Sequence, residues 1–266
     1  MPNHSALITV MTSAARKAAR NLSRDFGEVE HLQVSRKGTA DFVSAADLRA
    51  EETIFEVLTE ARPKFGLLME ERGIVEGQDN SNRWIVDPLD GTTNFLHGLG
   101  QFAISIGLER DRQPFAGVIF NPITDELFWA EKGAGAWLND NRIRVSNRSD
   151  LEDCLFATGL PFSGRPGRAE ALAQTERVLS KTAGIRRMGA AALDLAFTAA
   201  GRFDAYWERG LNPWDVAAGI ILVREAGGFV GPIGAGEKDT ADPLHDGTIL
   251  AGNARVFEKA RDLIEG

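Results

Sequence analysis

The sequence contains very little cysteine, histidine and tyrosine. Cys154 is the single cysteine among 266 residues, and the chain has four histidines and one tyrosine. A single cysteine excludes an intrachain disulfide and a zinc site built from several cysteines. Because Cys154 lies beside an apolar run at residues 155–157, we expect a small core residue and not a nucleophile.

Long apolar runs are also absent. No stretch reaches membrane-spanning length without charges, so we expect no membrane partner. Basic residues interrupt the segment from Ala14 to Arg24 too often for it to be the apolar core of a signal peptide. The segment does resemble an organelle transit peptide. Apolar residues recur there with helical spacing, which favours an amphipathic first helix and a cytoplasmic protein. These residues are Leu7, Val10, Ala14, Ala18 and Leu22.

An excess of positive charge is the third absence. Lys and Arg number 30 against 38 Asp and Glu, which gives a formal net charge of −8. Basic clusters such as Arg36-Lys37 are short, so we expect no direct nucleic-acid partner. The apolar fraction of 43% and the charged fraction of 26% are typical of a globular protein. The length suits one compact domain or one domain of two lobes.

The pattern of elements changes along the chain. Helices are expected at residues 5–26 and 46–60, with a turn at 37–41, and a buried strand at 84–86. Successive antiparallel strands are predicted at 103–108, 114–120 and 126–130. Beyond residue 151, strand-like and helix-like segments alternate, which suggests an α/β lobe. They cover 154–158, 169–180, 185–188, 191–200, 205–208, 216–226, 248–251 and 256–264. We place the boundary within 139–149, giving lobes 1–145 and 146–266.

The most informative segment runs from residue 87 to residue 95, where a predicted buried strand ends. Asp87 and Asp90 stand three residues apart, and Pro88 between them fixes one backbone angle. Gly91 allows a bound group to approach the backbone closely. Thr92 and its neighbours can open a helix with free N–H groups. The segment combines metal-binding acids with phosphate-binding donors, although the two aspartates alone could simply cap a turn.

Two further acidic positions have ordinary explanations when each is taken alone. Glu70-Glu71 follows an apolar run, and adjacent carboxylates repel unless water solvates them or cations bridge them. Asp215 follows Trp214 and precedes a strongly apolar helix. An acid at a helix start is a favoured cap, and an exposed pair of glutamates is common.

Taken together, these segments resemble the inositol monophosphatase family. Residues 84–97 (WIVDPLDGTTNFLH) are similar to the first signature of that family, and residues 214–228 (WDVAAGIILVREAGG) to the second. The resemblance extends over nearly the whole chain. It includes residues 37–41 with Asp47, Glu70-Glu71, and the run from Gly189 to Asp194.

The resemblance implies a role for each matching residue. Glu70, Asp87 and the carbonyl of Leu89 would hold a first metal ion. Asp87, Asp90 and Asp215 would hold a second, and Glu70 would share a third. Gly91 and Thr92 would offer N–H groups to the phosphate, and Thr92, supported by Asp47, would orient and activate the attacking water. The residues that would face the polyol hydroxyls are Glu208 and the backbone at Gly189 and Ala191.

The chemistry of phosphate monoester hydrolysis asks for such a site. The uncatalysed reaction is among the slowest known, because a dianion repels nucleophiles and the leaving alkoxide is poor. Two divalent ions about 4 Å apart can activate water and stabilise the leaving oxygen. Oxygen ligands favour Mg²⁺ or Mn²⁺ over zinc, and no histidine cluster competes. We therefore expect Mg²⁺, and the family resemblance implies two to three ions.

The family resemblance also implies a fold, an assembly and a substrate class. We expect an α/β (α+β) layered αβαβα sandwich of the sugar-phosphatase type. Its N-terminal lobe would hold a mainly antiparallel sheet and its C-terminal lobe would be α/β. A homodimer and inhibition by Li⁺ are implied, and the expected substrate is inositol 1-phosphate or a similar small-molecule phosphate ester.

Alternatives remain open on substrate and role. Histidinol phosphate, fructose 1,6-bisphosphate and 3′-phosphoadenosine 5′-phosphate are cleaved by related enzymes, and Arg165 and Arg168 are candidates for binding a second phosphate. Arg186 and Arg187 could reach the substrate or a partner subunit. Met69 and Ala190 depart from the common pattern and affect substrate preference. Some bacterial relatives also bind the transcription machinery, so a binding role is the non-enzymatic alternative.

Overall fold

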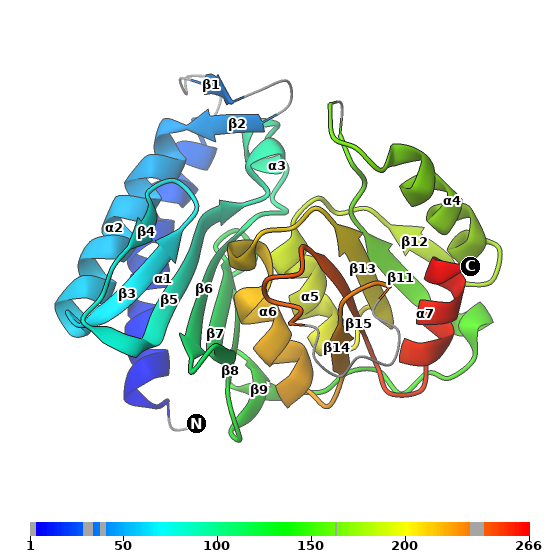
Figure 1. The fold of residues 1–266 in the computed structure, drawn as a ribbon. Helices are drawn as coiled ribbons and strands as arrows, with labels where there is room; N and C mark the ends of the chain where they lie inside the picture. Colours follow the sequence, from blue (N-terminus) through cyan, green and yellow to red (C-terminus); the bar gives the residue numbers. More distant parts are fainter. Residues whose placement is uncertain (1–3, 29–33, 38–40, 163, 235–241) are drawn as a thin grey trace.

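The structure is a computed structural model that describes residues 4–28, 34–37, 41–162, 164–234 and 242–266. Helices and sheets alternate in five layers (Figure 1). The helix pair α1 (Ala6–Phe26) and α2 (Ala45–Ala61) covers one face of an eight-stranded sheet. A second pair, α5 (Ala191–Ala199) and α6 (Pro213–Glu225), separates this sheet from a five-stranded one. The helices α4 (Arg168–Leu179) and α7 (Phe257–Glu265) cover the other face of the five-stranded sheet. The predicted αβαβα sandwich is confirmed.

The eight-stranded sheet is built almost entirely from antiparallel neighbours. Its order is β10-β9-β8-β7-β6-β5-β3-β4, and only β3 and β5 run parallel. The parallel pair places the C-terminal ends of β3 and β5 side by side. The strands are β3 (Phe65–Met69), β4 (Gly73–Val75), β5 (Asp79–Asp90), β6 (Ala103–Arg110), β7 (Gln113–Asn121), β8 (Glu126–Glu131), β9 (Gly135–Leu138) and β10 (Asn141–Ile143).

The five-stranded sheet is mixed, as expected for an α/β lobe. Its order is β12-β11-β13-β15-β14, with β11 parallel to both of its neighbours and β15 antiparallel to both of its own. The strands are β11 (Leu155–Thr158), β12 (Gly184–Arg186), β13 (Ala205–Arg209), β14 (Phe229–Gly231) and β15 (Thr248–Gly252).

Three smaller elements complete the described chain. The hairpin β1 (Val34–Lys37) and β2 (Asp41–Ser44) stands apart from both sheets, and residues 38–40 of the turn predicted between them lie outside the described residues. The short helix α3 (Thr92–Leu96) follows β5, and a 3₁₀ turn at Leu151–Asp153 leads into β11.

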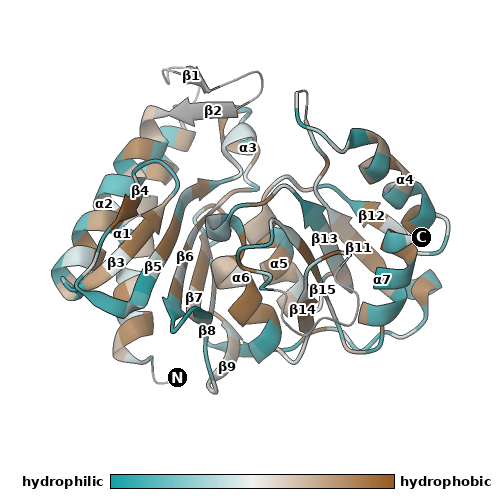
Figure 2. Ribbon diagram, in the orientation of Figure 1, coloured by the Kyte–Doolittle hydropathy of each residue, from teal (hydrophilic) through white to brown (hydrophobic). Residues whose placement is uncertain are grey.

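Buried apolar residues form the core between the layers. Figure 2 shows hydrophobic residues along the strands of both sheets and along the helices that lie between them. The spacing along α1 predicted its buried face well, because Ala14, Ala18 and Leu22 are fully buried, although Ile8 and Met11 are buried more deeply than Leu7 and Val10. Helix α6 contacts both sheets, so its residues 216–223 are buried on every side. No helix among the described residues has the length and apolar character needed to cross a bilayer.

Two glycines let α6 lie unusually close to the first sheet. A Cβ atom on Gly107 of β6 would stand 2.7 Å from the Cβ of Ala217. A Cβ on Gly117 of β7 would stand 2.7 Å from both the Cα and the carbonyl oxygen of Ala218. Because the second contact is with backbone, no side-chain rotation relieves it. The glycines of these two strands therefore determine how closely α6 packs against the sheet.

We predict that Gly117→Ala lowers the free energy of unfolding by about 1–3 kcal/mol, because the added methyl group forces α6 away from β7. Urea unfolding monitored by circular dichroism measures the change. Gly231→Ala is the matched control, since a Cβ on that strand glycine meets only ordinary contacts of 3.6 Å and longer. Equal stability of the parent and Gly117→Ala would contradict this account of the packing.

Candidate active site

The first acidic segment lies where β5 leaves the centre of the eight-stranded sheet. Asp87 and Asp90 are almost fully buried, with 2% and 9% of their surface exposed. The pairing of β5 with β6 shifts register between these two residues, so the strand end is irregular. The N–H of Leu89 donates a 2.9 Å hydrogen bond to Oδ1 of Asp87. This contact fixes the Asp87 carboxylate on its own backbone.

Residues 91–96 form a turn and the short helix α3. Gly91 has φ of 91°, and a Cβ there would stand 2.8 Å from the carbonyl oxygen of Gln101, so both conformation and space require glycine. The hydroxyl of Thr92 donates a 3.0 Å hydrogen bond to the carbonyl of Leu89. Its proton is thereby engaged, and its oxygen lone pairs remain available to accept a hydrogen bond from water.

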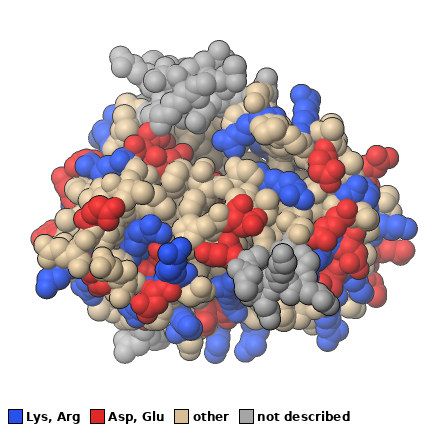
Figure 3. All heavy atoms as spheres, in the orientation of Figure 1, with Lys and Arg blue, Asp and Glu red and all other residues tan. Residues whose placement is uncertain are grey.

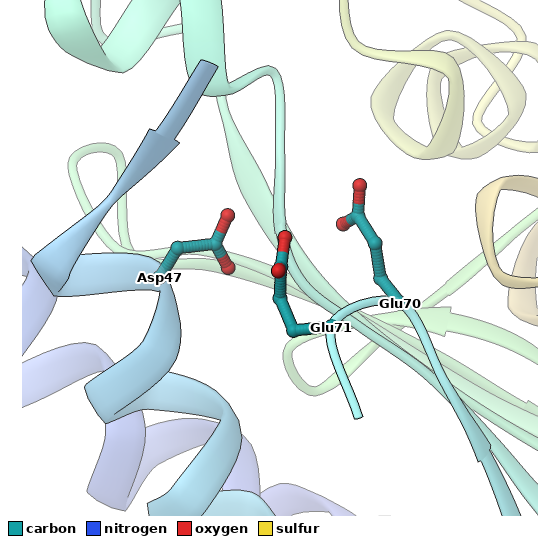
Figure 4. A group of neighbouring side chains, drawn as sticks. All are labelled: Asp47, Glu70 and Glu71. Carbon is teal, nitrogen blue, oxygen red and sulfur yellow. The ribbon is translucent and has the colours of Figure 1, made fainter. Parts of the chain in front are cut away.

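A second group of acids lies at the end of β3, beside β5. Asp47, Glu70 and Glu71 each offer a carboxylate oxygen, and the three oxygens lie within 4.8 Å of one another. Figure 4 shows Asp47 reaching from α2 toward Glu71, with Glu70 beside it. The loop is held in place because the N–H of Glu71 donates a 2.8 Å hydrogen bond to the buried Glu51 of α2.

Asp215 comes from the N-terminal end of α6. The helix begins three residues earlier than its apolar pattern suggested, at Pro213, with Asn212 as the N-cap. Asp215 is therefore the N3 residue of a capping box and not the cap itself. Its Oδ2 accepts a 2.6 Å hydrogen bond from the N–H of Asn212. The carboxylate is aimed by the same contact that starts the helix.

Backbone contacts also bring the 188–192 segment against β5 and α3. The N–H of Ala192, at the start of α5, donates a 2.8 Å hydrogen bond to Oδ2 of Asp90. The side-chain amide of Asn94 donates to the carbonyl of Met188 at 2.9 Å. Gly189, with φ of 81°, follows directly. These bonds tie the predicted phosphate-binding and polyol-binding segments together.

Most of the predicted site residues line one cavity of about 700 Å³. Figure 3 shows a hollow in the upper part of this face with basic side chains on its rim. Among the basic candidates, Arg165 and Arg187 line the cavity, whereas Arg168 and Arg186 do not. Of the other predicted residues, those in the wall are Glu70, Asp90, Gly91, Thr92, Gly189, Ala191, Glu208 and Asp215, and those outside it are Asp47, Asp87 and Leu89.

The acids of this region disturb one another electrostatically. Burial raises the pKa of Asp87 well above its usual range, and Glu70, Asp90, Asp215 and Asp47 raise it further. Burial likewise raises the pKa of Asp90, followed by the charge of Asp215. Burial lifts the pKa of Asp215 to about 6. Carboxylates in such a group ionise together only when cations compensate their charge.

The donor set fits hard divalent cations. The predicted ligands are carboxylate and carbonyl oxygens, which Mg²⁺ and Mn²⁺ prefer. The mutual repulsion of these carboxylates supplies the driving force for binding a cation. Glu71 was not among the predicted metal ligands, yet its carboxylate lies in the group with Asp47 and Glu70. Its position next to Glu70 was the available signal, and the adjacency alone could not show which of the two points inward.

Three residues around Glu208 were also not predicted. Tyr206 donates its hydroxyl to Glu208, Gly159 packs on the same carboxylate, and Asp194 is buried nearby. Within the described part of the chain, neither carboxylate oxygen of Asp194 has a hydrogen-bond partner. Burial raises its pKa well above the usual range, which favours the neutral acid. The signal for Tyr206 was its spacing of two from Glu208 on a predicted strand.

Comparisons of sequence support one assignment. A family model described as "Inositol monophosphatase family" matches residues 3–264. An inositol-1-monophosphatase of Mesorhizobium japonicum is 55% identical, over 96% of this chain and 94% of its own. One of Caulobacter vibrioides is also 55% identical, over 94% of this chain and 99% of its own. The Nus factor SuhB of Escherichia coli K12 is 39% identical, over 95% and 93% of the two chains.

Solved structures agree with the sequence comparisons. The extragenic suppressor protein suhB from Bartonella henselae superimposes with a TM-score of 0.92 at 53% identity, covering 98% of this chain and 99% of its own. An inositol monophosphatase from Anabaena superimposes with a TM-score of 0.84 at 37% identity, covering 97% and 94%. The similarity therefore extends through both sheets and all five layers.

We predict that Asp87→Asn stabilises the metal-free protein by roughly 0.5–2 kcal/mol at pH 7.5. The folded-state pKa of Asp87 is raised, so ionisation costs more in the folded chain than in the unfolded one. That destabilisation is absent below the unfolded pKa and develops as pH rises through the folded pKa. The gain should therefore shrink at pH 5. Asparagine retains the oxygen that accepts from Leu89.

Urea unfolding of EDTA-treated protein at the two pH values tests this prediction. Asp140→Asn serves as the control, because Asp140 is exposed and lies outside the cavity. A loss of stability in Asp87→Asn at pH 7.5 would show that the carboxylates do not repel one another in the way described.

Proposed function

The chain belongs to the inositol monophosphatase family, and from this premise we propose that it hydrolyses inositol 1-phosphate to inositol and phosphate in a Mg²⁺-dependent reaction. The observation that carries the proposal is the group of buried, mutually repelling acids at one end of the cavity. Buried acids with raised pKa values in a cleft are typical of catalytic and cation-binding sites. The assignment as a phosphatase agrees with the relatives named inositol-1-monophosphatase.

The metal ligands form the next part of the proposal. Glu70, Asp87 and the carbonyl of Leu89 would hold one Mg²⁺. Asp87, Asp90 and Asp215 would hold a second, and Glu70 would share a third. When bound, divalent ions supply an activated water and stabilise the leaving oxygen. Their contribution is supported here by the oxygen-only donor set and by the raised pKa values of Asp87, Asp90 and Asp215.

The chain's own residues would position the water and the phosphate. The hydroxyl of Thr92 donates to the carbonyl of Leu89, so its oxygen can accept a hydrogen bond from the attacking water. Asp47, buried at the start of α2, would support this orientation. Backbone N–H groups of Gly91 and Thr92 would hold the phosphate oxygens. Gly91 allows this approach because it has no side chain in the cavity wall.

Recognition of the polyol would come from another part of the cavity wall. Glu208 lines the cavity and can accept hydrogen bonds from substrate hydroxyl groups. The backbone at Gly189 and Ala191 would complete this wall. Ala190 stands between them, buried and without a hydroxyl, so it offers the polyol no side-chain hydrogen bond. We expect this feature to influence substrate preference.

Further parts of the proposal concern the lobes, the assembly and lithium. We place the lobe boundary near residue 145, because β10 ends at Ile143 and β11 begins at Leu155. A homodimer, a cytoplasmic location and inhibition by Li⁺ rest on the resemblance to the family. Light scattering after gel filtration measures the oligomeric state.

We predict that phosphate release from inositol 1-phosphate requires Mg²⁺, stops in EDTA, and falls at least about 100-fold in Asp90→Asn. The variant removes a proposed ligand charge but keeps an oxygen that can accept from Ala192. Added Li⁺ should reduce the rate. A colorimetric phosphate assay gives the initial rates, and Asp140→Asn should match the parent protein.

The same assay separates the alternatives. Mg²⁺-dependent release only from histidinol phosphate, fructose 1,6-bisphosphate or 3′-phosphoadenosine 5′-phosphate would keep the mechanism and change the substrate. An absence of release from every ester would overturn the enzymatic proposal.

A second candidate function is suggested by the relatives named Nus factor SuhB at 38–40% identity. We propose as the alternative that the chain binds a component of the transcription machinery. A pull-down with purified transcription proteins, using the parent and Asp90→Asn, tests it. Binding that survives the loss of the proposed metal ligand would support this role, and no capture would remove it.

A further inference from the structure

The one tyrosine of the chain lies in an unusual place. Tyr206 is fully buried in the core between the two sheets, where a phenol hydroxyl is costly unless it has a hydrogen-bond partner. The partner is Glu208, whose Oε2 accepts from the Tyr206 hydroxyl at 2.6 Å. The single polar group of the Tyr206 side chain therefore binds the carboxylate of Glu208 in the cavity wall.

The strand register explains why these two side chains meet. Residues two apart on a strand point to the same face, and Tyr206 and Glu208 both belong to β13. This strand is hydrogen-bonded on both sides, with Tyr206 opposite Ala157 of β11 and Ala251 of β15. The backbone carrying the pair is consequently held from both edges. Trp207, between them, points to the other face and packs near Phe156.

The phenol acts only as a donor toward Glu208. Burial raises the pKa of Tyr206 well above its usual range, and the charge of Glu208 raises it further. The hydroxyl therefore keeps its proton across the physiological range. Its bond occupies Oε2 of Glu208, so the carboxylate presents Oε1 as its less engaged oxygen.

The backbone of Gly159 lies directly against the Glu208 carboxylate. This residue follows β11, next to β13, and it lines the cavity with Glu208. A Cβ atom built on Gly159 would overlap the carboxylate carbon and both oxygens of Glu208. The backbone of Gly159 does not adopt a positive φ, so close approach and not conformation makes glycine necessary here.

From these two contacts we propose that Tyr206 and Gly159 are positioning residues that fix the Glu208 carboxylate for selecting polyol phosphates. Tyr206 holds one oxygen by its hydrogen bond, and Gly159 leaves the space that the carboxylate occupies. A fixed acceptor discriminates between substrates because a hydroxyl must lie at one place to reach it. The inference rests on the proposed phosphatase function and names two residues that determine which alcohol is accepted.

The test compares two phosphate esters in the Mg²⁺-loaded enzyme. Inositol 1-phosphate carries hydroxyl groups that Glu208 would bind, whereas p-nitrophenyl phosphate carries none beside its phosphate. In Tyr206→Phe we expect the KM for inositol 1-phosphate to rise about tenfold, with kcat changed less than about twofold. The kcat/KM for p-nitrophenyl phosphate should stay unchanged. A defect of folding alone would affect both esters alike.

A double-mutant cycle separates positioning from packing. Glu208→Gln removes the charged acceptor, so adding Tyr206→Phe to it should cause little further loss with inositol 1-phosphate. Fully additive losses would overturn the proposal, because they would show that Tyr206 acts independently of Glu208. An unchanged KM for inositol 1-phosphate in Tyr206→Phe would overturn it as well.

Gly159→Ala provides a second variant that leaves the tyrosine in place. The added methyl group displaces the carboxylate, so the same selective rise in KM for inositol 1-phosphate is expected. If circular dichroism shows that Tyr206→Phe does not fold, Gly159→Ala replaces it in the test. Equal effects of Gly159→Ala on both esters would contradict the inference. The parent protein distinguishes the two levels of proposal, since failure of the parent to release phosphate from either ester would reject the proposed function itself.

Discussion

Mutual repulsion among buried and half-buried carboxylates is the constraint on which the rest of the structure depends. Asp87, Asp90 and Asp215 all have raised pKa values, with burial as the largest cause in each case. Left to themselves, such groups would move toward water or lose their charge. Each is instead held by a backbone N–H group, from Leu89, Ala192 and Asn212 respectively. These hydrogen bonds hold the three carboxylates close together. Their mutual repulsion is relieved when cations compensate the charge.

The scaffold meets this constraint by drawing the acids from different layers. Asp87 and Asp90 end a central strand, Asp47 and Glu51 belong to the outer helix α2, and Asp215 begins the helix between the sheets. Strands β3 and β5 are the one parallel pair in the first sheet, and this pairing brings the 70–71 loop beside residue 87. The second sheet contributes Glu208 on β13 to the lining of the same cavity. The cavity therefore lies where the ends of β3, β5, β11 and β13 meet the start of α6.

Much of this arrangement could be predicted from the sequence, and the reason differs between elements. Helical spacing along α1 and the alternating strands β6 to β8 are local patterns, so they predicted the elements well. The two signature segments carried the fold class and the choice of Asp87, Asp90 and Asp215. Strands β4, β9, β10 and β14 were missed because each has three or four residues, too few for a periodicity to emerge. Glu51 and Gly159 were missed because their importance lies in contacts with residues 20 and 49 positions away, which no local pattern displays. Tyr206 was missed although its spacing of two from Glu208 is local, because the spacing alone does not show a hydrogen bond.

The apolar helix α6 has a consequence for the energetics of the whole molecule. It belongs in sequence to the second lobe, yet it packs against strands β5 to β9 of the first as well as against β14 and β15 of the second. Separation of the lobes would expose both of its sides to water, along with the sheet faces that it covers. The lobes are therefore thermodynamically inseparable, and unfolding of either one removes the support of the other. Loss of the fold and loss of the acid cluster, whose Asp215 begins this same helix, become one cooperative event.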